Sequence, residues 1–203
     1  LPNCVEMIEL ILTCFESGII LVPLSNNITN NELDKIVNVI QPNAIITNWE
    51  LSKRISNISI PVLYIEELPS IGRGCQVFKS EYEQNLNDIC TIMMTSGTTD
   101  SPKAVQLTYN NFKSSCENWH HFLQFTHGDQ FLCCLPLTHI GGLAVLVRAL
   151  IYGFSINLSK SFSSELIYQI LSKDSVTIIS LVPTMLQRII EQPDGLNYLR
   201  SLR

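Results

Sequence analysis

The apolar residues of the chain alternate between a helical period and short continuous runs. Helical spacing predicts helices at residues 5–16, 30–39, 112–125, 143–150, 164–171 and 183–192. Apolar runs bounded by turn residues predict buried strands at residues 19–22, 44–47, 89–94, 104–107, 131–135, 154–158 and 177–181. This alternation predicts an α/β fold with mostly parallel sheets flanked by helices.

Several ends of these elements carry sequence signals. Gly18 is expected to end the first helix, and Pro23 to end the short strand that follows it. Asn30 or Asn31 is expected to cap the second helix, and Pro183 fits the first turn of the last one. Three leucines beyond that helix have no evident packing partner: Leu196, Leu199 and Leu202.

A polar stretch interrupts the pattern at residues 70–88, where charges accompany Gly72 and Gly74. Such composition predicts a surface connection and a boundary between subdomains. We expect a first α/β subdomain portion at residues 1–88 and a second portion at residues 89–203, which carries a hydroxyl-rich loop.

Composition excludes several function classes. The net charge of −5 leaves no broad basic field, so nucleic acid is not an expected partner. Arg148 interrupts the longest apolar stretch, residues 140–154, so no membrane span is expected. Charged residues make up only 15% of the chain, which predicts that some apolar surface faces another part of the protein or a homo-oligomeric partner.

The seven cysteines include no C-x-x-C pair, and Cys133 and Cys134 are sequence neighbours. Neither a zinc site nor a disulfide framework is indicated. Buried cysteines that act as small hydrophobic residues favour reduced thiols in a cytoplasmic protein.

The most informative segment is the loop from Thr95 to Lys103, between two predicted strands. It combines hydroxyl side chains with Gly97, which lets the backbone approach a ligand closely, and with the charge of Lys103. A polar turn that binds nothing has the same composition. A P-loop is excluded, because Pro102 stands where its second glycine belongs and Ala104 follows the lysine.

The loop resembles the signature T-S-G-T-T-G-x-P-K-G-V of the adenylate-forming superfamily, which includes the acyl-CoA synthetases. Eight of its ten specified positions match: Thr95, Ser96, Gly97, Thr98, Thr99, Pro102, Lys103 and Val105. Asp100 and Ala104 replace glycines. At about 7 Å the charge of Asp100 would repel the phosphates by on the order of 1 kcal/mol. Ala104 would be strained if its position required a positive φ.

A second segment, residues 131–143, resembles the family pattern of a strand followed by P-L-x-H-x-x-G-L. The resemblance implies that His139, with Gly141 and Gly142, borders the acyl pocket and the channel for the thiol. The alternative is that His139 only caps the next helix. Residues 139–153 are most similar to o-succinylbenzoate-CoA ligases of menaquinone synthesis. Arg148 in this stretch could face a dicarboxylate substrate or an acidic residue at the surface, and the surface position is preferred.

The resemblance implies an ATP-dependent carboxylate-CoA ligase that forms an acyl-AMP intermediate, with ATP, Mg²⁺, a small carboxylate and CoA as its small-molecule partners. Thr95, Ser96, Gly97, Thr98, Thr99 and Lys103 would hold the phosphates, with Thr95 near Mg²⁺ and His139 in a catalytic position. His120, His121 and His127 are expected at the surface or partly packed.

Nothing in the chain matches the family's adenine-binding, metal-binding and ribose-binding segments or its C-terminal domain with the catalytic lysine. We therefore expect an N-terminal-domain fragment that lacks the C-terminal domain and is inactive in isolation. Two alternatives stay open: a degenerate, non-catalytic nucleotide-binding relative, and an interaction domain.

Overall fold

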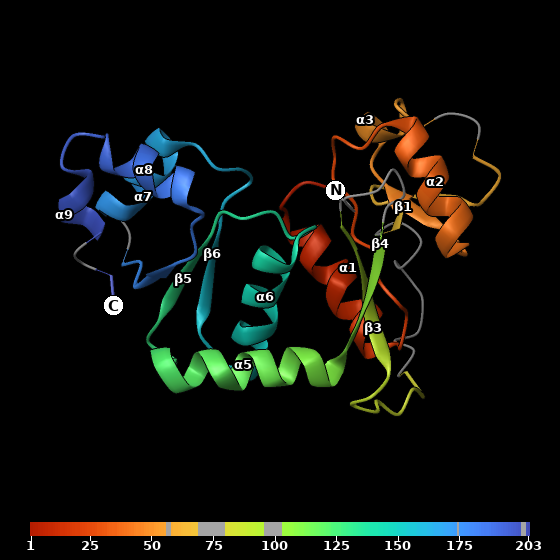
Figure 1. Ribbon diagram of the computed structural model, residues 1–203, viewed down its shortest axis with the longest axis horizontal. Helices are drawn as coiled ribbons and strands as arrows, with labels where there is room; N and C mark the ends of the chain where they lie inside the picture. The colour runs from red at the N-terminus through yellow and green to blue at the C-terminus, as the bar shows by residue number, and fades with distance from the viewer. Residues whose placement is uncertain (56–57, 69–79, 96–102, 174, 200–201) are drawn as a thin grey trace. The chain divides into compact units, whose positions relative to one another are not determined.

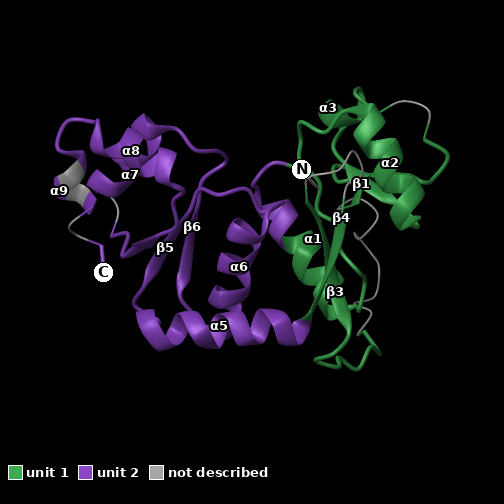
Figure 2. Ribbon diagram, in the orientation of Figure 1, with its two compact units in different colours: residues 1, 9–108 green, residues 2–8, 109–203 purple. Residues whose placement is uncertain are grey.

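The computed structural model describes residues 1–203 except 56–57, 69–79, 96–102, 174 and 200–201. The chain forms two compact units (Figure 2): unit 1 comprises residues 1 and 9–108, and unit 2 comprises residues 2–8 and 109–203. These units divide after Thr108 and not after residue 88. The assignment of residues 1–88 and 89–203 to subdomains of a larger domain stays a prediction.

Unit 1 is built on two small sheets (Figure 1). Its elements are α1 (Val5–Glu16, shared with unit 2), α2 (Asn30–Ile40), β1 (Ile45–Thr47), α3 (Trp49–Ser52), β2 (Val62–Tyr64), β3 (Ile89–Thr95) and β4 (Lys103–Thr108). β1 and β2 pair in parallel, whereas β3 and β4 are antiparallel. The buried strand predicted at residues 19–22 is wrong: Leu21 makes a single bridge to Thr91, and Ile19 and Ile20 are exposed.

Helix α2 begins with a capping box that the sequence reading missed. The Thr29 hydroxyl accepts from the backbone of Glu32, whose carboxylate accepts in return from the Thr29 backbone N–H. The expected caps Asn30 and Asn31 are therefore helical residues.

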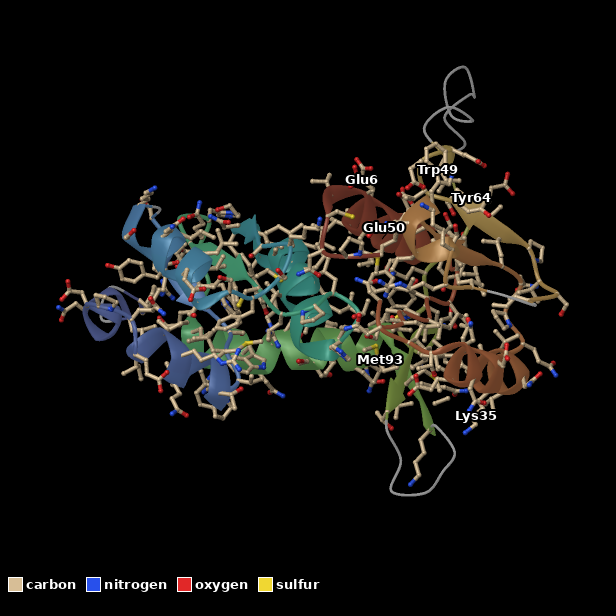
Figure 3. All side chains as sticks on the ribbon, turned by 90° about the horizontal axis from the view of Figure 1, so that it is seen from above. Glu6, Lys35, Trp49, Glu50, Tyr64 and Met93 are labelled. Atoms are coloured by element: carbon tan, nitrogen blue, oxygen red, sulfur yellow. The ribbon has the colours of Figure 1, made fainter. Side chains whose placement is uncertain are left out.

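Figure 3 labels two side chains of unit 1 that differ in exposure: Lys35 on α2 is exposed, whereas Met93 on β3 is buried.

Unit 2 contains a three-stranded parallel sheet in the order β6-β5-β7. Its elements are α5 (Tyr109–Leu123), β5 (Gln130–Cys133), α6 (Ile140–Tyr152), β6 (Ser155–Leu158), α7 (Ser164–Lys173), β7 (Ile178–Ile179), α8 (Pro183–Ile190) and α9 (Gly195–Leu199). The predicted α/β fold is confirmed. The short elements α3, β2 and α9 were not predicted.

One apolar cluster of unit 2 joins the sheet to its last helices. Its buried members are Leu132, Cys134, Ile167, Leu171, Val176 and Ile189. Leu199 and Leu202 pack against this cluster, so they have the partner that the sequence could not supply. The side chain of Leu196 lies outside the described residues. No helix among the described residues has the length and apolar character to cross a membrane.

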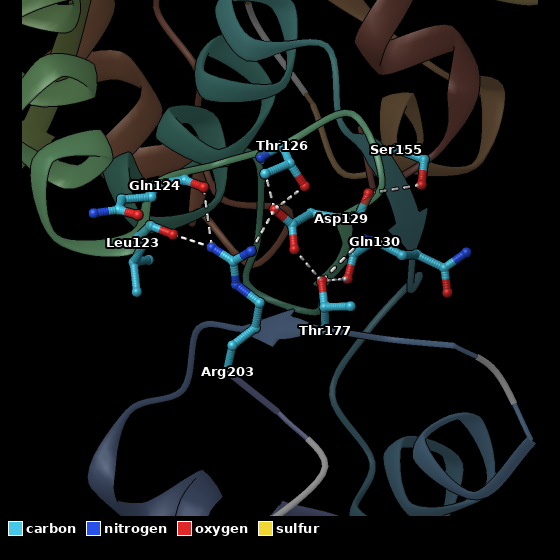
Figure 4. Close-up of polar contacts among 8 residues, drawn as sticks. All are labelled: Leu123, Gln124, Thr126, Asp129, Gln130, Ser155, Thr177 and Arg203. Carbon is cyan, nitrogen blue, oxygen red and sulfur yellow. Dashed lines mark hydrogen bonds and ion pairs between the residues drawn. The ribbon is translucent and has the colours of Figure 1, made fainter.

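A polar cluster around Asp129 ties the start of β5 to β7 and to the segment after α5 (Figure 4). The carboxylate, 2% exposed, accepts hydrogen bonds from the Thr126 backbone N–H at 2.8 Å and from the Thr177 hydroxyl at 2.8 Å. Arg203 lies 3.4 Å from it and also donates to the carbonyls of Leu123 and Gln124. This buried acid therefore joins the amino-terminal ends of β5 and β7 and the segment after α5.

Candidate functional site

The two described ends of the hydroxyl-rich loop lie opposite each other in the β3–β4 hairpin. Thr95 is the last residue of β3, Lys103 is the first of β4, and the two are direct partners in the register. The Thr95 hydroxyl donates to the Lys103 carbonyl at 3.5 Å. Both residues are exposed, and Lys103 forms no ion pair with any residue that the structure describes. The ammonium group is thus available to an anion.

The other predicted phosphate ligands, Ser96, Gly97, Thr98 and Thr99, lie outside the described residues, as does Asp100. Ala104 is described: it sits in β4 opposite Met94. It is absent from the described residues with positive φ, so the strain considered for an alanine at this glycine position does not arise.

His139 occupies the N-cap position of α6. Its backbone is extended, with φ −119° and ψ 153°, and its carbonyl accepts from Gly142 and Leu143. The side chain makes no capping hydrogen bond and is exposed. His139 therefore caps α6 through its backbone, as the alternative expected, while its imidazole makes no capping hydrogen bond; the role of His139 in the acyl site stays a prediction.

Gly142 lets helix α6 approach the turn that precedes it. A Cβ atom at Gly142 would lie 2.3 Å from the Pro136 carbonyl oxygen and 2.7 Å from that of Leu135. At Gly141 an added Cβ would meet only the Leu135 side chain, at 3.0 Å. A packing requirement therefore explains Gly142, and a substrate contact of either glycine stays a prediction.

Arg148 is buried, so the preferred surface position is wrong. Its side chain is 6% exposed and its guanidinium lies 4.8 Å from the centroid of the Trp119 ring. Nε has no hydrogen-bond partner among the described residues, and Glu117 on the neighbouring helix is paired with Lys113 at 2.8 Å. Burial lowers the pKa of Arg148, and the charge persists at neutral pH. The guanidinium thus lacks an anionic partner in the described structure.

The other histidines are packing or surface groups, as expected. His120 stacks on Tyr152 with ring centroids 4.2 Å apart, His121 is exposed, and His127 contacts the Gly153 carbonyl through Nδ1 at 3.2 Å. None of these three histidines was predicted as a site residue.

The six described cysteines are free thiols. Burial raises the pKa of Cys133 to about 12 and that of Cys134 to about 11, so neither is an activated nucleophile. No group of acidic, histidine or cysteine residues able to hold a metal ion occurs among the described residues.

The whole chain, residues 1–203, matches the family model for AMP-binding enzymes. The chain belongs to the AMP-binding enzyme family. Among curated relatives of this chain are proteins named 2-succinylbenzoate–CoA ligase, from Oceanobacillus iheyensis (33% identity over 99% of this chain) and from Enterococcus faecalis (32% over 99%). The chain spans only 42% and 41% of the length of these two proteins.

Solved structures agree with this membership. The o-succinylbenzoate coenzyme A synthetase MenE from Bacillus subtilis, in complex with ATP and magnesium ion, superposes on this chain with a TM-score of 0.84. The identity is 28%, over all of this chain and 53% of that one. MenE in complex with the acyl-adenylate OSB-AMP gives a TM-score of 0.83 at 27% identity, over 95% of this chain and 50% of that one.

One residue bonded to the turn before His139 has no counterpart among the residues predicted from the sequence. Asn3 is buried, and its side chain makes hydrogen bonds to the backbone 132 to 156 positions away, at Leu135, Leu137 and Ser159. No local pattern announces such a contact, because its partners become neighbours only in the folded chain.

Proposed function

We propose that the protein is an ATP-dependent carboxylate–CoA ligase that works through an acyl-adenylate and takes o-succinylbenzoate as its carboxylate. The observation that carries the proposal is the β3–β4 hairpin. It pairs Thr95 with Lys103, the first residue and the lysine of the family's phosphate signature. The family match over residues 1–203 and the relatives named 2-succinylbenzoate–CoA ligase support it.

The chemistry has two steps. A carboxylate oxygen attacks the α-phosphorus of ATP and pyrophosphate leaves; the CoA thiol, losing its proton, then attacks the acyl carbon and AMP leaves. Lys103 and the hydroxyl-rich loop would bind the β and γ phosphates, with Thr95 beside the magnesium ion, which neutralises phosphate charge when bound. His139, exposed at the start of α6, would shape the acyl site.

The phosphate role of Lys103 predicts a specific kinetic change. In the protein expressed from its whole coding sequence, Lys103→Gln should raise the KM for ATP at least tenfold, because a charge-assisted hydrogen bond contributes about 1.5–3 kcal/mol. Steady-state pyrophosphate exchange dependent on o-succinylbenzoate measures it. Lys35→Gln, which removes another exposed ammonium from unit 1, is the matched control and should leave the KM unchanged.

Two outcomes would count against this proposal. An unchanged KM for ATP in Lys103→Gln would remove the loop from phosphate binding. Asp100 and Ala104, the two departures from the family signature, suggest a degenerate relative. Pyrophosphate exchange that is absent in the wild type but present in the Asp100→Gly, Ala104→Gly double variant would favour that alternative.

The buried Arg148 supports the choice of a dicarboxylate. A buried guanidinium is stabilised most by a carboxylate in bidentate contact, and the described residues offer it none. We propose that the ring carboxylate of o-succinylbenzoate fills this role. The competing explanation is that Arg148 only packs on Trp119.

Arg148→Met separates these explanations. The variant should raise the KM for o-succinylbenzoate about thirtyfold, a loss of about 2 kcal/mol, and leave unchanged the KM for 4-oxo-4-phenylbutanoate, which lacks the ring carboxylate. A purely structural role would instead lower the melting temperature and affect both substrates alike. Arg188→Met on α8 is the control for removal of an exposed guanidinium from unit 2.

A further inference from the structure

The side-chain amide of Asn3 bonds one turn and the neighbouring strand end through both its donors and its oxygen. Nδ2 donates to the carbonyls of Leu135 and Ser159, each at 3.0 Å, and Oδ1 accepts from the Leu137 N–H at 2.8 Å. The residue is 8% exposed; its bonds to Ser159 and Leu137 are buried, and its bond to Leu135 is partly buried. A buried amide with two donors and one acceptor satisfied is held in a single orientation.

The partners of Asn3 lie at the carboxyl ends of two adjacent parallel strands. Leu135 and Leu137 belong to the turn of residues 135–139 that joins β5 to α6, and Ser159 follows β6 directly. Ser159 is itself bonded to β5 through its N–H and the Cys133 carbonyl, at 3.0 Å. Asn3 therefore joins the 135–139 turn to the edge of the sheet where ligands of α/β proteins bind.

The 135–139 turn carries His139 at its end. Inside the turn the His139 N–H donates to the Pro136 carbonyl at 3.0 Å, and outside it Asn3 holds the residues on both sides of Pro136. The imidazole makes no capping bond and is exposed, so its position depends on the backbone of this turn. Without Asn3, the Leu137 N–H and the Leu135 carbonyl would each lose a buried partner.

We propose that Asn3 is a positioning residue for the acyl site, acting through the 135–139 turn to fix His139; this rests on the ligase function proposed above. A small displacement of a group that orients substrate lowers the rate of reaction strongly. Asn3 thereby affects the use of the carboxylate and leaves the phosphate loop, which lies on the β3–β4 hairpin, untouched.

The test is a double-mutant cycle on the protein expressed from its whole coding sequence. Asn3→Ala should lower kcat/KM for o-succinylbenzoate about tenfold and leave the KM for ATP within about twofold. In the His139→Ala background the same substitution should change kcat/KM less than about twofold, because the group that it positions is gone. Equal losses in both backgrounds would overturn the proposal.

Thr177→Val is the matched control for destabilisation, because it removes hydrogen bonds at the opposite end of β5, to Asp129 and Gln130. It should lower the melting temperature without changing the ratio of the two substrate KM values. If Asn3→Ala unfolds at the assay temperature, Asn3→Asp replaces it, since it keeps the acceptor for Leu137 and loses both donors.

Amide hydrogen exchange separates failure of this proposal from failure of the ligase function. Asn3→Ala should speed exchange at Leu137 and His139 by at least tenfold and leave Ile167 on α7 unchanged. If the wild type has no carboxylate-dependent exchange of pyrophosphate, the ligase function fails and the amide rates alone decide about the turn. Unchanged protection at Leu137 and His139 would overturn the role of Asn3.

Discussion

Gly142→Ala is expected to lower the free energy of unfolding by about 3 kcal/mol, because the new methyl group has no space. Its Cβ would lie 2.3 Å from the Pro136 oxygen, 2.6 Å from the Pro136 carbonyl carbon and 2.7 Å from the Leu135 oxygen, all of them backbone atoms. Helix α6 would have to move away from the 135–139 turn. That movement would also strain the bond between the His139 N–H and the Pro136 carbonyl.

Gly141→Ala is the matched control, one residue away in the same helix. Its Cβ would meet only the end of the Leu135 side chain, which can rotate. Alanine also favours a helix over glycine by about 0.5–1 kcal/mol, so this variant should be neutral or slightly more stable.

Thermal unfolding of the two variants measures the contrast. Gly142→Ala should melt about 6–12 °C below the wild type, since 1 kcal/mol corresponds to about 2–4 °C at this chain length. If both variants had the melting temperature of the wild type, the inference that α6 lies too close to the turn for a Cβ atom at Gly142 would be wrong. A raised KM for the carboxylate without loss of stability would instead assign Gly142 to substrate contact.

The sequence predicted most elements correctly because their signals are local. Residues 5–16 were predicted as a helix and form α1. The helix ends at Glu16, and Gly18, which has a φ of +68°, follows it as expected. The capping box of Thr29 and Glu32 was also a local signal, but the two asparagines beside it have similar capping preferences and concealed it.

The antiparallel pairing of β3 and β4 departs from the mostly parallel arrangement that the alternation predicted. Its cause is visible in the sequence: only nine residues, 95–103, separate the two predicted strands. A parallel connection needs a crossover of about a dozen residues or more, so a hairpin was the only pairing open to them.

The site was predicted only in part because its supports are distant in sequence. The resemblance selected Lys103 and His139, and the structure places both at exposed ends of regular elements. The partners of Asn3 could not be inferred from spacing. Arg148 was expected at the surface, and the position of its guanidinium over the Trp119 ring is a tertiary contact that no local pattern predicts.

Asp129→Ala is expected to lower the free energy of unfolding at pH 7 by about 3 kcal/mol. The carboxylate is almost fully buried, and its loss leaves the Thr126 N–H, the Thr177 hydroxyl and Arg203 without their shared acceptor. Removal of one member of a buried polar network costs more than the net contribution of a single bond, because the remaining groups stay desolvated.

The stabilisation by Asp129 should depend on pH in a defined direction. Burial alone would raise the pKa of Asp129, but the bonds from Thr126 and Thr177 and the charge of Arg203 outweigh it and hold the pKa below the ordinary value. A carboxyl group whose pKa is lower in the folded state stabilises fully above its unfolded pKa, about 4. This contribution is lost as the pH falls through the folded pKa.

Urea unfolding of the wild type and Asp129→Asn between pH 7 and pH 3 measures this dependence. The variant should be less stable at pH 7, and the difference should shrink below about pH 4 as the wild-type carboxylate becomes protonated. Asp34→Asn, which changes an exposed carboxylate on α2, should show no such convergence. A stability difference between wild type and Asp129→Asn that stays constant across this range would mean that Asp129 is not held as a buried anion, and the polar cluster at the start of β5 would need another explanation.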